Sequence, residues 1–163
     1  MRPVSEARFL WDETNLYIGL FAADEDIRAT VTAHDGPVWT DDAFTMKIQP
    51  LPAGSVTYLV DISAAGVVTD VRRDAAGHED PAWESGAEVA VDRDGTLNDP
   101  ADFDEEWVVE AAIPLQAIGL QARAGAGALV EIRRCDTPRE GTGRICGRFG
   151  GRGSELRAIE LTP

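Results

Sequence analysis

The sequence has few of the residues that common catalytic and metal centres require. Its 163 residues include only two histidines and two cysteines, and they contain no GxSxG, HExxH or CxxC pattern. No apolar stretch approaches the roughly 18 to 20 residues of a membrane span. The first residues also lack the basic and apolar regions of a signal peptide. We therefore expect a domain that is not an enzyme and has no membrane partner.

Positive charge is also scarce. Fifteen Lys and Arg residues face 29 Asp and Glu residues, which gives a net charge of −14 and a pI near 4.4. Binding to nucleic acid or to anionic lipid requires a cluster of cations that neutralises phosphates, and the sequence contains no such cluster. Neutral or cationic ligands fit this composition better.

The two cysteines, Cys135 and Cys146, lie eleven positions apart in a segment rich in Gly and Arg. They are too few for a disulfide scaffold, and their spacing fits no zinc motif. One disulfide or two free thiols are both compatible with the sequence. A disulfide would indicate an oxidising compartment.

Short apolar runs that are rich in Val, Ile, Phe and Tyr indicate a mostly β chain. In one run, Phe44, Met46 and Ile48 alternate with polar residues, which predicts one core face and one face toward water or ligand. One helical turn is expected over residues 114–119, between a proline and a glycine. We predict a single domain over residues 1–163, an antiparallel two-sheet β-sandwich with at most one short helix. The expected strands are 8–11, 16–23, 44–48, 56–62, 67–72, 87–91, 107–113, 129–134 and 155–161.

An acidic segment at residues 92–99 has the dense oxygen ligands that Ca²⁺ prefers. It is not an EF-hand, because Leu97 stands where that motif requires Gly and Phe103 where it requires Glu. A solvated acidic loop without metal is the alternative. The expected ligands of a structural Ca²⁺ are Asp92, Asp94, Asn98 and Asp99.

Four tryptophans are candidates for sugar contact, because flat aromatic faces stack on the apolar faces of sugar rings. Trp11 and Trp107 lie in strand patterns and are expected in the core. Trp39 and Trp83 lie in loop sequence that is rich in Asp, Gly and Pro. Both are therefore candidate carbohydrate contacts.

Three motifs, taken together, resemble the family 9 carbohydrate-binding modules over about residues 9–149. They are W-D-E-T-N-L-Y-I-G-L-F-A-A-D-E-D-I, V-W-T-D-D-A-F-T-M-K-I-Q-P and G-T-L-N-D-P-A-D-F-D-E-E-W-V-V-E-A-A-I-P-L. The resemblance implies a non-catalytic β-sandwich that binds oligo- or polysaccharide between two tryptophans and carries structural calcium. Such modules are usually accessory to secreted glycoside hydrolases, which implies an attached or partner hydrolase and an extracellular or periplasmic location.

Carried onto this chain, the resemblance assigns Trp39 to one sandwiching tryptophan. The family's sugar-binding glutamate, six residues later in the same strand, is Thr45 here, so its carboxylate is lost. In place of the second tryptophan the chain offers Phe149 as a weaker stacking residue. Arg72 and Arg134 are expected as polar contributors.

The resemblance leaves three further expectations open. The opening strand that usually precedes the first motif is missing, so we expect an upstream start or another element at the exposed edge. A sandwich that has lost its sugar site would serve as a structural or interaction module instead. Related sandwiches that bind haem b use Met with His or Lys, which makes a redox domain with Met46 a further alternative.

Overall fold

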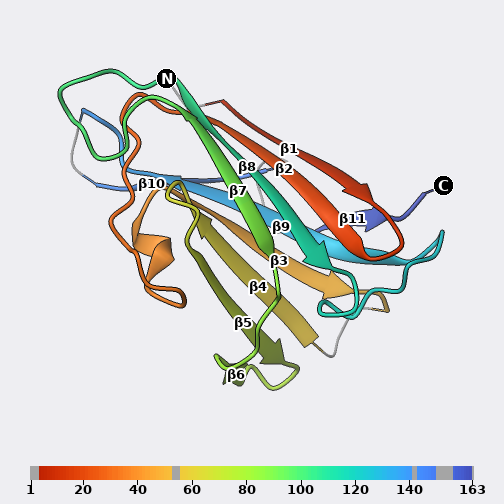
Figure 1. Ribbon diagram of the computed structural model, residues 1–163. Helices are drawn as coiled ribbons and strands as arrows, with labels where there is room; N and C mark the ends of the chain where they lie inside the picture. Colours follow the sequence, from red (N-terminus) through yellow and green to blue (C-terminus); the bar gives the residue numbers. More distant parts are fainter. Residues whose placement is uncertain (1–3, 53–55, 141–142, 150–155, 163) are drawn as a thin grey trace.

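The fold is built from two antiparallel sheets that lie face to face (Figure 1). The computed structural model describes residues 4–52, 56–140, 143–149 and 156–162. One sheet has four strands in the order β1-β2-β8-β7, and the other has seven, in the order β10-β9-β3-β4-β5-β6 with β11 also paired to β9. The two sheets confirm the predicted all-β sandwich.

The bounds of the elements are close to those expected. The four-stranded sheet contains β1 (Ser5–Trp11), β2 (Asn15–Ala23), β7 (Glu88–Asp94) and β8 (Glu106–Pro114). The seven-stranded sheet contains β3 (Ala43–Pro50), β4 (Val56–Ser63), β5 (Val68–Asp74), β6 (Glu79–Asp80), β9 (Gly127–Asp136), β10 (Ile145–Arg148) and β11 (Arg157–Glu160). One 3-10 helix, η1 (Val38–Thr40), precedes β3. No helix among these residues is long and apolar enough to cross a membrane.

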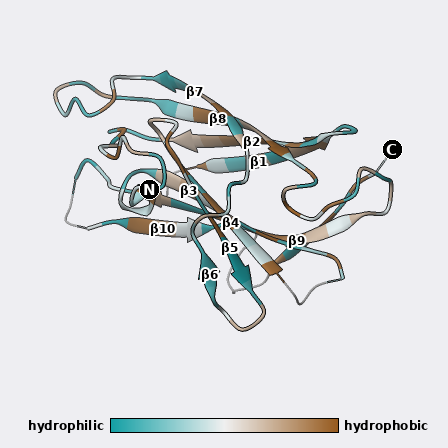
Figure 2. Cartoon of the chain, turned by 60° about the horizontal axis from the view of Figure 1, so that its bottom comes forward, coloured by the Kyte–Doolittle hydropathy of each residue, from teal (hydrophilic) through white to brown (hydrophobic). Residues whose placement is uncertain are grey.

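The hydrophobic core lies between the two sheets. Phe44, Met46 and Ile48 of β3 are fully buried, as their alternation predicts, and the Phe44 ring lies 4.8 Å from that of Trp107 in β8. Figure 2 shows hydrophobic segments in both sheets, whereas β6 and the end of β5 are hydrophilic. The alternate residues of β3 therefore point away from the core, to what we call the outer face of the seven-stranded sheet.

Two expectations about elements need correction. The predicted helical turn at 114–119 is a series of hydrogen-bonded turns, closed by the Leu120 N–H on the Leu115 carbonyl, while the helix found is η1. The strands β6 and β10 were not predicted, because they are short and polar. Residue 155, where the last predicted strand begins, lies outside the described residues.

Candidate functional site

Five residues form a continuous row across the outer face of the seven-stranded sheet. Because residues in register stand side by side on one face, five adjacent strands each contribute one side chain. The register pairs Arg148 of β10 with Arg133 of β9, Arg133 with Thr45 of β3, Thr45 with Asp61 of β4, and Asp61 with Thr69 of β5. We call these residues the central row. It brings hydroxyl, carboxylate and guanidinium groups onto one surface.

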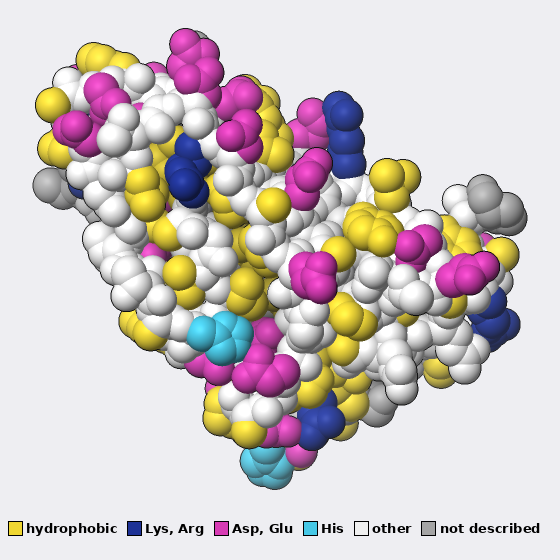
Figure 3. Space-filling view, in the orientation of Figure 1, with side chains coloured by type: hydrophobic (Ala, Val, Ile, Leu, Met, Phe, Trp, Pro, Cys, Tyr) yellow, Lys and Arg dark blue, Asp and Glu magenta, His cyan; other side chains and the backbone are white. Residues whose placement is uncertain are grey.

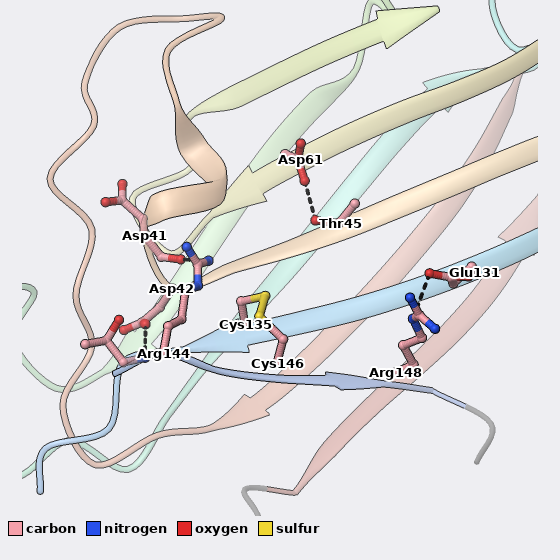
Figure 4. Close-up of a disulfide and its surroundings, with 10 residues drawn as sticks. Asp41, Asp42, Thr45, Asp61, Glu131, Cys135, Arg144, Cys146 and Arg148 are labelled. Atoms are coloured by element: carbon pink, nitrogen blue, oxygen red, sulfur yellow. Dashed lines mark hydrogen bonds and ion pairs between the residues drawn. A yellow bond between two sulfur atoms is a disulfide. The ribbon is translucent and has the colours of Figure 1, made fainter. Parts of the chain in front are cut away.

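A carboxylate lies beside the position where the sequence indicated that one is lost. The Thr45 hydroxyl donates a hydrogen bond to the Asp61 carboxylate (Figure 4). Burial raises the pKa of Asp61, while the Thr45 hydroxyl and the charges of Arg133 and Arg144 oppose that shift. Because a carboxylate accepts up to about four hydrogen bonds, the bond from Thr45 leaves room for ligand hydroxyls.

Trp39 lies on η1, close to β3 and β4 of the central row. Its side chain is 51% exposed, while Val38 beside it is fully buried and η1 packs against β3 and β4. The hydroxyl of Thr69 donates to the carbonyl of Gly36 at 2.5 Å, which ties the loop before η1 to the row. A Cβ at Gly36 would lie 2.6 Å from Val31 Cγ1, so the loop requires glycine there. The loop thus presents a large aromatic surface on a fixed support.

A disulfide joins β9 and β10, the two strands at the other end of the central row. Cys135 of β9 and Cys146 of β10 are directly opposite in the register and are bonded to each other (Figure 4). Just before β10, the Arg144 guanidinium donates to the Asp41 carbonyl. Of the two states that the sequence left open, the structure therefore contains the disulfide, which holds β10 on the sheet edge.

Three of the predicted sugar contacts point into the sandwich instead. Arg134 is only 4% exposed, Phe149 packs against Phe44 at 6.1 Å between ring centroids, and Trp83 packs against Tyr58 at 4.9 Å. Alternation explains Arg134, because it is the strand neighbour of the outward-facing Arg133. Arg134 is thus buried, and Trp83 and Phe149 are partly buried against the core, so none of the three is part of the central row.

Arg72 also lies off the outer face. It stands opposite the buried Tyr58 in the register and pairs with Asp80 at 2.6 Å. The adjacent Arg73 takes the outer face and pairs with Glu79. Among the predicted sugar contacts, Trp39 and Thr45 are the two that the structure brings to the outer face.

Sequence reasoning missed four charged residues of this surface, Asp61, Arg133, Arg144 and Arg148. Asp61 was detectable as one acidic residue inside an apolar strand, V-T-Y-L-V-D-I. Its pairing with Thr45 was not detectable from the sequence. The two strands are joined by more than a two-residue turn, so the connection does not fix their register.

Three buried carboxylates lie at the end of the sandwich that carries the loop before η1. Asp24, Asp42 and Asp136 have oxygens within 4.8 Å of one another, and Arg134 donates to Asp24 at 3.0 Å and to Asp136 at 3.1 Å. The indole N–H of Trp107 also donates to Asp24. Burial, followed by the charge of Asp24, raises the pKa of Asp42 to about 7, and the same two causes raise that of Asp136. This cluster is close enough to hold either a proton or a cation.

A second group, at the surface, combines His34, Asp35 and Glu84. Their ligand atoms also lie within 4.8 Å of one another, and His34 Nε2 is 2.9 Å from the Glu84 carboxylate. That contact raises the pKa of His34. Within the described residues these two groups are the ones with three carboxylate or imidazole ligands close together.

The predicted calcium loop has a different arrangement. Asn98 accepts the Ala29 N–H at 2.9 Å and donates to the Ala29 carbonyl at 2.7 Å, so its side chain ties two loops together. Asp99 accepts the N–H of Ala101. Asp92 and Asp94 are exposed at the end of β7. Calcium binding in this loop stays a prediction.

Met46 does not reach the outer face. Its side chain is fully buried in the core, on the opposite side of β3 from Lys47. An axial haem ligand must contact the haem iron, whereas the Met46 side chain contacts the packed residues of the core. The position of Met46 therefore argues against the haem-binding alternative.

Comparison with known proteins identifies the family. The family model described as "Carbohydrate family 9 binding domain-like" matches residues 2–145. The chain belongs to this family. No curated protein matches the sequence.

Solved structures share the fold of this family 9 domain at low sequence identity. A candidate carbohydrate-binding protein from Bacteroides uniformis ATCC 8492 has a TM-score of 0.75 and 13% identity, over 99% of this chain and 79% of that one. Two structures of a family 9 module from Caldicellulosiruptor kristjanssonii contain cellotriose and glucose. They have TM-scores of 0.57 and 0.58, identities of 13% and 14%, and cover 99% of this chain and 76% and 78% of theirs.

Proposed function

We propose that this family 9 domain binds an oligo- or polysaccharide on the outer face of the seven-stranded sheet, beside Trp39. The observation that carries the proposal is the pairing of an exposed tryptophan with the central row. Trp39 offers a flat apolar surface for a sugar ring, and Asp61, Thr45 and Arg133 offer acceptors and donors for its hydroxyls.

The family of this domain also supports the sugar-binding proposal. Its family 9 relatives from Caldicellulosiruptor kristjanssonii were solved with cellotriose and with glucose. For this chain the loss of the family glutamate at Thr45 favoured a degenerate interaction module. The Asp61 carboxylate beside Thr45 weakens that alternative, because the site retains an acidic acceptor.

The wider role follows from the family and from the disulfide. We infer that the domain is accessory to polysaccharide breakdown by an attached or partner glycoside hydrolase, and that it has no catalytic role itself. The disulfide between Cys135 and Cys146 fits an oxidising, extracellular or periplasmic compartment.

Calorimetric titration of cello-, xylo- and manno-oligosaccharides tests the sugar-binding proposal. A shallow site with few anchors predicts dissociation constants in the micromolar to millimolar range. Removing Trp39 uncovers roughly 60 Å² of apolar contact, so Trp39→Ala is expected to weaken binding by about 1.5 kcal/mol, or about tenfold.

The matched control is Phe103→Ala, which removes an aromatic side chain that is 71% exposed elsewhere on the surface. It should bind sugar as the wild type does. Equal binding by wild type and Trp39→Ala would place the site elsewhere, and no heat with any sugar would favour the interaction module.

A further inference from the structure

The outer face of the seven-stranded sheet brings four cations together near the site, in a protein whose net charge is −14. Acidic side chains are spread over the face shown in Figure 3, with basic ones scattered among them. We call the four cations around the central row, Lys47, Arg133, Arg144 and Arg148, the cationic cluster. Asp61 and Glu131 face it from the same strands, and the charges of Asp41 and Asp42 also act on Arg144.

The charge of Arg133 is compensated in part by Asp61, one strand beyond Thr45. Arg133 stands directly opposite Arg148 in the register of β9 and β10, and like charges in that position repel each other. Glu131 does not relieve Arg133, because its carboxylate pairs with Arg148 at 3.1 Å (Figure 4). The Nε of Arg133 is buried and has no hydrogen-bond partner among the described residues.

Arg144 has an unmet donor as well. Its terminal nitrogen donates to the Asp41 carbonyl, but within the described part of the chain its Nε has no partner. Burial lowers the pKa of Arg144, and the charge of Arg133 lowers it further, although Asp42 opposes the shift. The two guanidinium groups are therefore close enough to repel each other.

We infer that the site prefers an acidic saccharide, one with uronic acid residues whose carboxylate binds Arg133 and Arg144. This inference rests on the proposed function and adds the substrate class. A guanidinium offers parallel N–H groups that match the two oxygens of a carboxylate, and such charge-assisted bonds are among the strongest polar contacts. The bound carboxylate would pair with guanidinium N–H groups and reduce the repulsion within the cationic cluster. Neighbouring sugar rings would then extend along the row toward Trp39.

A matched pair of ligands isolates this charge. Cellotetraose and its C6-oxidised counterpart differ in having a hydroxymethyl or a carboxylate group on each ring. Calorimetry at about 0.15 M salt, where the Debye length is about 8 Å, limits the long-range repulsion by the acidic protein. We expect the wild type to bind the oxidised ligand about tenfold more tightly or better, as charge-assisted hydrogen bonds predict.

Three variants test the inference, and each has a different expected effect on the preference for the oxidised ligand. Arg133→Gln should lose most of the preference for the oxidised ligand, measured as the ratio of the dissociation constants of the two ligands, even where its binding of both is weaker. Asp61→Asn should increase the preference, because it removes the carboxylate that would repel the ligand. Arg8→Gln, on the exposed β1 strand, changes the net charge equally and should leave the preference unchanged. Thermal unfolding of each variant shows that it is folded.

The outcomes separate the two proposals. If cellotetraose binds and the oxidised ligand binds no more tightly, the acidic-saccharide inference is wrong and sugar binding stands. If neither binds and no other sugar does, both are wrong. A sulfated cello-oligosaccharide and free acetate are titrated as well. If the sulfated ligand is preferred as strongly as the oxidised one, the site recognises anionic saccharides in general rather than uronic acids alone.

Discussion

Replacing Asp136 by asparagine is expected to stabilise the domain at pH 8 and to reduce the dependence of its stability on pH. Asp136 belongs to the buried cluster of three carboxylates, two of which, Asp24 and Asp136, pair with the guanidinium of Arg134. An asparagine can still accept the hydrogen bond from Arg134 through its oxygen, and its amide can donate to Asp24. The substitution therefore removes one buried negative charge while it keeps the geometry.

The direction of the pH dependence of stability follows from the raised pKa values of the buried carboxylates. A carboxylate whose folded pKa exceeds its unfolded pKa binds its proton more tightly in the folded state, so stability rises as pH falls through the folded pKa. Burial raises the pKa of Asp42 in the fold to about 7 from its ordinary value of 3.8. Between pH 8 and pH 5, Asp42 alone is expected to add about 2 to 3 kcal/mol to the free energy of unfolding. The pKa of Asp136 is raised as well.

Urea unfolding at pH 5, 6, 7 and 8, at constant ionic strength and with a chelator present, measures this effect. The wild type should be most stable near pH 5. The free energy of unfolding of Asp136→Asn should exceed that of the wild type by about 1 kcal/mol or more at pH 8, because the substitution removes one repelling charge. Glu110→Gln, on an exposed position of β8, is the charge-matched control and should follow the wild type. A wild type that is more stable at pH 8 than at pH 5, or an Asp136→Asn curve parallel to the wild type, would refute this account.

The other predictions concern the disulfide and the loops. Serine at both Cys135 and Cys146 opens a loop whose ends are 11 residues apart, which should lower the free energy of unfolding by about 3 kcal/mol in urea titrations. Asn98→Ala should cost about 1 to 2 kcal/mol in the same assay, because both main-chain groups of Ala29 lose a partner. If the acidic loop binds Ca²⁺, adding Ca²⁺ to chelator-treated protein should raise the Tm of the wild type but not of Asp94→Asn; no rise in the wild type would leave a solvated loop.

The sequence predicted the architecture because alternation is a local property. Each β-strand with one buried face repeats its apolar residues with a period of two, so Phe44, Met46 and Ile48 were assigned to the core without knowledge of their partners. The strands β6 and β10 carry no such signal. They exist because a neighbouring strand, and for β10 a disulfide, holds them.

The candidate site was harder to predict because it depends on register. Trp39 and Thr45 came from a linear motif, and the structure places both on the outer face. Arg134 was chosen over Arg133 although the two differ by one position, and that one position decides between the core and the outer face. A linear motif identifies the strand but does not show which charges from other strands complete the site.

The pairing of Thr45 with Asp61 shows why the central row, rather than any single position, is the unit to compare between members of this family. Residues directly opposite on antiparallel strands have Cβ atoms about 5 Å apart. A carboxylate can therefore move from one strand to the next and still reach the same ligand hydroxyl, with only a small change in direction. In this chain that move leaves Thr45 as a hydrogen-bond donor to Asp61 and places the carboxylate one strand farther from Arg133 than a glutamate at position 45 would be. The guanidinium of Arg133 is then available to a ligand, which connects the missing family glutamate to the preference for an acidic saccharide.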